Sequence, residues 1–153
     1  MPNMRGLLPS LIAVLFFSSV AVADNGLISL KSSYSVIDTA DRLEDILKKK
    51  GMTVFIRINH AEGAAKVGKK LRPTELVIFG NPRVGTPLMQ CRQSVAIDLP
   101  QKALIWEDAK GQVWLSYNDP RYLKKRHNIN QCDTVINKIE HALGNFSRAA
   151  AGR

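Results

Sequence analysis

Four places where an apolar run meets a turn lie close together in the middle of the chain, at residues 77–82, 85–90, 97–100 and 117–120. Each places Gly, Pro, Asn or Asp directly beside residues typical of a buried strand. These residue types favour turns, and they bring backbone groups and polar side chains together at the rim of a sheet. The pattern therefore predicts a sheet with a binding site on its rim.

Local patterns along the rest of the chain predict the other elements. Strands are expected around residues 28–30, 53–58 and 76–79, followed by a hairpin of 103–107 with 112–117. Helices are expected from the Ser35 cap to Gly51, from the Asn59 cap to Val67, from Thr86 through Cys91, over 95–98, and after Pro120. A last helix carries an apolar stripe of Val135, Ile139, Ala142 and Phe146. This order predicts an α+β fold, a two-layer sandwich of a mixed sheet of about five strands with helices packed on it.

Together with Trp106-Glu107-Asp108, these blocks resemble the bacterial and archaeal family called domain of unknown function 302. The resemblance covers most of residues 24–153 and is best over 56–127. It implies a fold and candidate positions rather than a reaction, with a core of about 31–128 and a C-terminal helix of about 133–147. The family pattern suggests Asp before His60, where this chain has Asn59, so the resemblance lends no support to a carboxylate role at that position.

The N-terminus has the pattern of a secretory signal peptide. Arg5 precedes a mostly apolar stretch over 7–22, and Ala21-Val22-Ala23 offers small residues at the cleavage spacing. Pro9 and the serines interrupt that stretch, which is shorter than the roughly 20 residues that span a bilayer. We expect cleavage after Ala23, a single domain over 24–153 with its least ordered part at 148–153, no transmembrane segment after cleavage, and a periplasmic or secreted protein.

Export affects how the two cysteines are interpreted. Thiols in an oxidising compartment tend to pair, and Cys91 and Cys132 are the only cysteines in the chain. A disulfide is the preferred prediction, with two buried thiols as the alternative. A zinc site of Cys91, Cys132 and His127 is a third interpretation, although it lacks the close cysteine pair typical of such sites.

The chain is basic, with a formal net charge of +9 at pH 7. Part of the excess of positive charge lies at 48–50, at the end of a predicted helix, where cations complement the helix dipole. The remaining clusters, at 66–72 and 121–126, form either a solvated surface or one that meets an acidic ligand or membrane headgroups. Nucleic acid is disfavoured, because no recognition motif or aromatic stacking pattern accompanies the charge.

The first candidate site is the segment between the third strand and the following helix. It resembles a phosphate-binding loop without the Lys-Ser/Thr pair that ATP hydrolysis needs. Free amides with Arg83 could still hold a carboxylate or phosphate there. A polar pocket is also expected where the last strand ends, and the residues proposed to bind a ligand are Gly80, Asn81, Arg83, Gly85, Thr86, Tyr117 and Asn118.

Two other kinds of site are compatible with the sequence. His60 with Asp98 or Asp119 would form an acid–base pair, with Thr86 or Cys91 as nucleophile, although no catalytic signature accompanies them and a bridged Cys91 cannot attack. Met89 with one of the three histidines would ligate haem or copper without a covalent link, whereas Met89 in the core is the ordinary interpretation. The histidines concerned are His60, His127 and His141.

The sequence thus predicts an exported binding or accessory protein that recognises a small anionic ligand or a protein partner. The alternatives are a small periplasmic enzyme that uses His60, and a haem or metal protein. A protein that mainly self-associates is a third class, to be recognised by an exposed apolar sheet or helix face. No specific cofactor or metal is indicated, and a homo-oligomer is compatible with the sequence.

Overall fold

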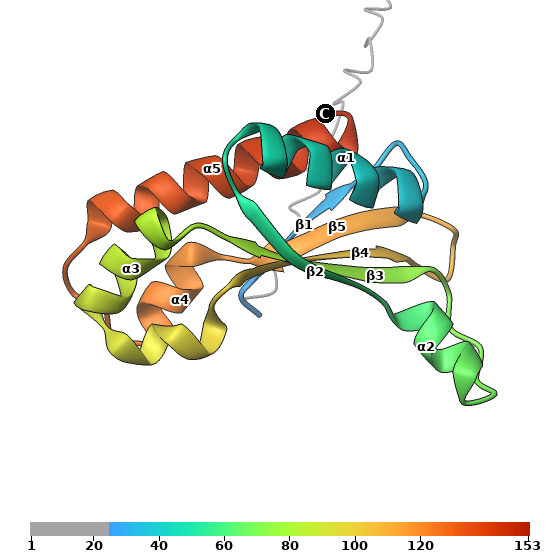
Figure 1. Cartoon of the computed structure of the whole chain (residues 1–153), viewed down its shortest axis with the longest axis horizontal. Coiled ribbons are helices and arrows are strands. Elements are labelled where there is room, and N and C mark those ends of the chain that lie inside the picture. Colours follow the sequence, from blue (N-terminus) through green and yellow to red (C-terminus); the bar gives the residue numbers. More distant parts are fainter. Residues whose placement is uncertain (1–24) are drawn as a thin grey trace, which may run out of the picture.

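The computed structural model describes residues 25–153, so the predicted signal peptide lies outside the described residues. At its centre is one sheet in the order β1-β5-β4-β3-β2, with every neighbouring pair antiparallel (Figure 1). The α+β sandwich is confirmed, but the mixed sheet is wrong. The segments after β2 and β3 reverse the chain at the ends of the sheet, so successive strands pair antiparallel. The strands are β1 Leu27–Lys31, β2 Thr53–Asn59, β3 Thr74–Gly80, β4 Gln101–Glu107 and β5 Val113–Asn118.

The two longest helices lie on one face of the sheet, and the shorter ones lie at its two ends (Figure 1). The face is covered by α1 Val36–Lys49 and α5 Asp133–Ala151. At one end lies α2 His60–Lys66, and at the other end lie α3 Pro82–Cys91, the 3₁₀-helix η1 Gln93–Asp98 and α4 Pro120–Arg126. Within residues 25–153, every helix is too short or too polar to cross a membrane.

The core lies between the sheet and its covering helices. Alternate residues of the three central strands point to this face, as the strand period of two requires. Helix α5 contributes to the same buried cluster, in which Ala150 is fully buried. The prediction that the C-terminal tail is the least ordered part is therefore wrong up to residue 151, because this tail continues α5 and packs against the core. The core members are Val77, Phe79, Ala103, Ile105, Val113, Leu115 and Tyr117 from the sheet, Val36, Ala40, Leu43, Leu47, Ile136, Ile139, Leu143 and Ala150 from the two covering helices, and Leu88, Val95 and Ile129 from the segments at the end of the sheet.

The opposite face of the sheet is only partly covered and carries large apolar side chains. Ile56 is 50% exposed, and Trp106 and Trp114 stack with ring centroids 6.4 Å apart. Both indole N–H groups are used within the chain: Trp106 donates to Ser116 Oγ at 3.0 Å and Trp114 donates to Asp108 Oδ2 at 2.8 Å. Polar side chains share this face with the indoles, since Lys31 Nζ lies 5.5 Å from the centroid of the Trp114 ring and the hydroxyls of Ser29 and Ser116 hydrogen-bond at 2.8 Å.

Most helix starts follow the predicted caps. Ser35, Asn59 and Asp119 each accept a hydrogen bond from a backbone N–H in the first turn of their helices. The exception is α3, which begins at Pro82 behind the cap Asn81, not at Thr86. Asn81 followed by proline is itself a cap followed by a favoured first residue, and this earlier pair starts the helix. The predicted phosphate-binding loop is therefore mostly helix.

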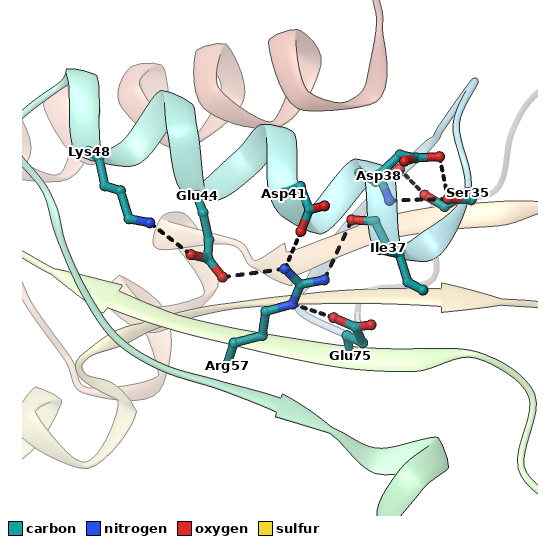
Figure 2. A network of polar contacts seen from close by, with 9 residues as sticks. Ser35, Ile37, Asp38, Asp41, Glu44, Lys48, Arg57 and Glu75 are labelled. Carbon is teal, nitrogen blue, oxygen red and sulfur yellow. Dashed lines mark hydrogen bonds and ion pairs between the residues drawn. The ribbon is translucent and has the colours of Figure 1, made fainter.

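Arg57 connects α1 to the sheet (Figure 2). Its guanidinium pairs with Asp41 and Glu44 of α1 and with Glu75 of β3, while Lys48 pairs with Glu44 at 3.1 Å. Burial of the guanidinium lowers the pKa of Arg57, but hydrogen bonds to Glu75 and Asp41 outweigh this and raise it above its ordinary value. The side chain of Glu75 is only 5% exposed, so its charge depends on Arg57 for compensation.

A disulfide joins Cys91 at the end of α3 to Cys132, the residue before α5. The predicted pairing is confirmed. Of the residues of α3, only Leu88 is buried, so this helix has little packing of its own. The crosslink therefore holds α3 against the rest of the fold, and the zinc alternative loses both of its thiolates.

We expect Arg57→Met to lower the free energy of unfolding by about 3 kcal/mol, because it leaves the buried Glu75 carboxylate unpaired. The matched control Lys48→Met removes a cation that is 61% exposed and should cost less than about 0.5 kcal/mol. Urea denaturation measures both. Equal losses in the two variants would show that Glu75 does not need its partner.

Removing the disulfide by the double change Cys91→Ala, Cys132→Ala should cost about 4 kcal/mol in the chain-entropy account. The two cysteines are 41 residues apart, and the open chain gains the freedom that this closed loop lacks. Urea denaturation of the oxidised protein and of the variant measures the difference. Adding a reductant should bring the wild type to the stability of the variant and leave the variant unchanged; a wild type that keeps its stability after complete reduction would contradict the account.

Candidate functional site

A cavity of about 300 Å³ opens at the end of the sheet where β2 begins and β3 ends. Its walls come from these strands, from α3 and η1, and from one side of α5. Side chains or backbone of the following residues line it: Met52, Phe55, Gly80, Asn81, Pro82, Val84, Gly85, Thr86, Met89, Ala96, Leu99, Pro100, Gln101, Ile139, Ala142, Leu143 and Phe146. The volume lies at the small end of the range of about 300–1,000 Å³ that is usual for small-molecule sites.

A bulge in β2 sets the direction of a side chain in one wall of the cavity. Val54 pairs with Phe79 and Ile56 with Ile78, which leaves Phe55 as the extra residue. A bulge leaves its extra residue out of the ladder and changes the direction of its side chain. The Phe55 ring lies over Gly80, where an added Cβ would come within 3.3 Å of it. Glycine at position 80 therefore allows this aromatic ring to close over the strand.

The chemistry of the cavity is apolar. Among the described residues that line it, the polar side chains are Asn81, Thr86 and Gln101, and none is charged. Asn81 is already engaged, since its Oδ1 accepts from Arg83 N at 2.9 Å and its Nδ2 donates to Gly51 O at 2.9 Å. Thr86 is exposed. Such a site favours a ligand with a largely hydrocarbon surface.

The residues proposed to bind a ligand are only partly brought together. Gly80, Asn81, Gly85 and Thr86 line the cavity, whereas Arg83, Tyr117 and Asn118 do not. Tyr117 and Asn118 end β5, two strands and about 10 Å away from β3. Tyr117 points into the core, and its burial raises the pKa of the phenol. The cavity therefore does not extend to the end of β5, where the polar pocket was expected.

The basic cluster at 121–126 has acidic partners within the fold. Arg121 pairs with Glu140 at 2.9 Å and Lys124 pairs with Asp133. The hydrogen bond from Arg121 lowers the pKa of Glu140. These pairs leave less positive charge available to an anionic ligand than the sequence indicated.

The acid–base pair built on His60 is not formed. His60 follows β2 at the end of the sheet where β3 begins, since Asn59 pairs with Glu75. Asp98 precedes β4 and Asp119 follows β5, both at the other end, about 20 Å along the strands. Asp98 instead contacts His127, with 2.5 Å between Oδ2 and Nε2, while Asp119 caps α4.

The residues proposed to ligate haem or copper do not lie together either. Met89 lines the cavity, but His60 lies at the far end of the sheet, and His127 is held by Asp98 and Ser94. His141 is exposed on α5. Within residues 25–153, no three His, Cys, Asp or Glu side chains come together in a way that would hold a metal ion.

Sequence reasoning missed half of the cavity wall. The bulge at Phe55 depends on pairing with β3 and has no local signal. The apolar stripe of α5 was a usable signal, because its members Ile139, Ala142 and Phe146 are wall residues. Ile139 of this stripe, and Leu143 beside it, belong both to the buried core and to the cavity wall.

Comparison with known proteins supplies relatives of three kinds. The sequence model of the family described as "Domain of unknown function DUF302" matches residues 28–146. Two similar proteins are both named "Fluoride-specific ion channel FluC 1", from Brucella suis biovar 1 (strain 1330) and Brucella abortus biovar 1 (strain 9-941). Each is 43% identical over 133 residues, which are 86% of this chain and 52% and 49% of theirs. The chain therefore spans about half the length of these curated relatives.

A solved structure shows the same fold. The crystal structure of an uncharacterized conserved DUF302 protein from Bacillus stearothermophilus superposes with a TM-score of 0.74 at 20% identity. The match covers 82% of this chain and 98% of that one. By the span of the family match and this shared fold, the chain belongs to the family described as Domain of unknown function DUF302.

Proposed function

We propose that the protein binds a small, largely apolar molecule in the cavity between α3, η1 and α5. The observation that carries the proposal is the cavity lining, in which hydrocarbon and aromatic side chains surround three polar ones without a charge among the described lining residues. This proposal keeps the binding role predicted from the sequence and replaces the anionic ligand by an apolar one.

The size of the cavity sets the expected affinity. A ligand that buries about 300 Å² of apolar surface gains about 7.5 kcal/mol at about 25 cal/mol per Å². Lost translational and rotational freedom offsets at least about 4 kcal/mol of that gain. The remaining gain of about 3.5 kcal/mol corresponds to millimolar binding of a simple hydrocarbon probe, and a larger or better-fitting natural ligand should bind more tightly.

The test fills the cavity from α5. Ala142→Trp places an indole into the space, and Ala149→Trp places the same side chain on an exposed position of the same helix. Titration with the neutral fluorophore N-phenyl-1-naphthylamine should give saturable binding to the wild type and to Ala149→Trp, with at least about tenfold weaker binding to Ala142→Trp. Thermal unfolding of each variant checks that it is folded. Equal binding by all three proteins would overturn the cavity as the site.

A second candidate function is that of an accessory protein to a fluoride channel. The observation that favours it is that the Brucella relatives, which carry the name of a fluoride-specific ion channel, are about twice as long as the region shared with this chain. Linking two regions in one polypeptide keeps them at high effective concentration, which suits parts that act together. We infer that the region shared with these relatives acts beside a fluoride channel.

That candidate is tested by co-expressing the tagged chain with a fluoride channel from the same genome. Affinity purification in mild detergent should recover the channel with the chain, and an unrelated membrane channel expressed to the same level serves as the control. Recovery of both channels in equal amounts, or of neither, would remove the accessory role. Periplasmic or secreted location and a homo-oligomeric state stay predictions.

A further inference from the structure

A group of hydrogen-bonded polar side chains begins on η1, outside the cavity. A 3₁₀-helix has about three residues per turn, so residues three apart share one side. Ala96 and Leu99 line the cavity, and Val95 and Asp98 are buried. Ser94 is exposed together with Ile97, which is 74% exposed. The three sides of this short helix thus have different surroundings, and the exposed one carries a hydroxyl beside an apolar side chain.

Behind Ser94 lies a chain of hydrogen bonds. The Ser94 Oγ is 3.1 Å from His127 Nδ1, and His127 Nε2 is 2.5 Å from Asp98 Oδ2. A carboxylate can only accept, so Nε2 carries the proton that Asp98 binds. In the neutral imidazole, Nδ1 is then an acceptor and faces the serine hydroxyl. The tautomer that a general base requires is therefore the one that the hydrogen bonds select.

The imidazole and the carboxylate are held in place. His127 and Asp98 are both buried, and Arg126 Nη1 donates to the second carboxylate oxygen of Asp98 at 3.1 Å. His127 ends α4, where its backbone N–H donates to Leu123 O at 3.1 Å. The disulfide at Cys91 anchors the chain three residues before Ser94. A fixed base beside an exposed hydroxyl is the arrangement of an activated nucleophile.

We propose that Ser94, His127 and Asp98 form a nucleophilic centre that acts on small carboxylic esters. Ser94 Oγ attacks the carbonyl carbon while its proton passes to His127 Nδ1. The bond between that carbon and the ester oxygen then breaks, and His127 returns the proton to the leaving alcohol. Water repeats the sequence on the acyl-serine, which releases the acid and restores the hydroxyl. Ser94 and His127 are the catalytic residues, and Asp98 is a positioning residue.

The neighbourhood of Ser94 indicates the kind of acyl group. Ile97 stands one turn further along η1 on the same side, so a short aliphatic acyl chain can lie against it. Arg126 is engaged by Asp98. The centre does not depend on the cavity, because η1 separates them, and the two sites can be tested independently.

The nucleophile is tested with a fluorophosphonate probe, which leaves its phosphonyl group on an activated serine and releases fluoride. The folded protein with its disulfide intact is incubated with the probe, and intact mass and peptide mapping locate the adduct. Ser94→Ala is the test variant. Ser33→Ala is its control, because Ser33 is another exposed serine, placed in the loop before α1.

We expect one adduct on Ser94 in the wild type and in Ser33→Ala, and none in Ser94→Ala. Asp98→Asn and His127→Gln should slow the labelling by about 100-fold or more, the range of a lost general base. A structural role alone would change the unfolding temperature of these variants and leave the labelling rate of the folded fraction unchanged. Absence of an adduct on Ser94 in the folded wild type, or an equal rate in Asp98→Asn, would overturn the proposal.

Discussion

The bond between Cys91 and Cys132 is the constraint on which this end of the molecule depends. It fastens α3, which buries only Leu88, to the start of α5. The two helices enclose an apolar space, and the side chains that line it lack contacts on the side of the cavity even where Val84 and Met89 of α3 pack against the core. The crosslink thus replaces the contacts that a filled core would have given, and the cavity is stable because the walls are tied together.

The 3₁₀-helix η1 divides this end into two chemical environments. On its inner side, Ala96 and Leu99 belong to an apolar wall, and on its outer side Ser94 faces a buried imidazole. The first environment suits binding through surface burial, and the second suits proton transfer. One short element therefore separates the proposed binding site from the proposed ester chemistry, and neither depends on the other.

The elements with local signals were predicted from the sequence. The cap at Ser35 and the glycine at residue 51 bound α1 correctly, because both act within one turn of the helix. The start of α3 was misplaced because two cap–proline signals compete, one at Asn81 and one at Thr86. The pairing of Asp98 with His127 joins residues 29 positions apart, and no periodicity reports such a contact. The sheet was expected to be mixed because helices between strands are also typical of parallel crossovers.

If the cavity holds an apolar molecule, that molecule should accompany the protein when it is purified from its own host. The protein is purified with its disulfide intact, and its mass is recorded under native and denaturing conditions. The account predicts a bound hydrocarbon-rich species in the wild type that denaturation releases and that is absent from Ala142→Trp. The same species retained by Ala142→Trp, or a bound ligand that is a small inorganic anion, would contradict it.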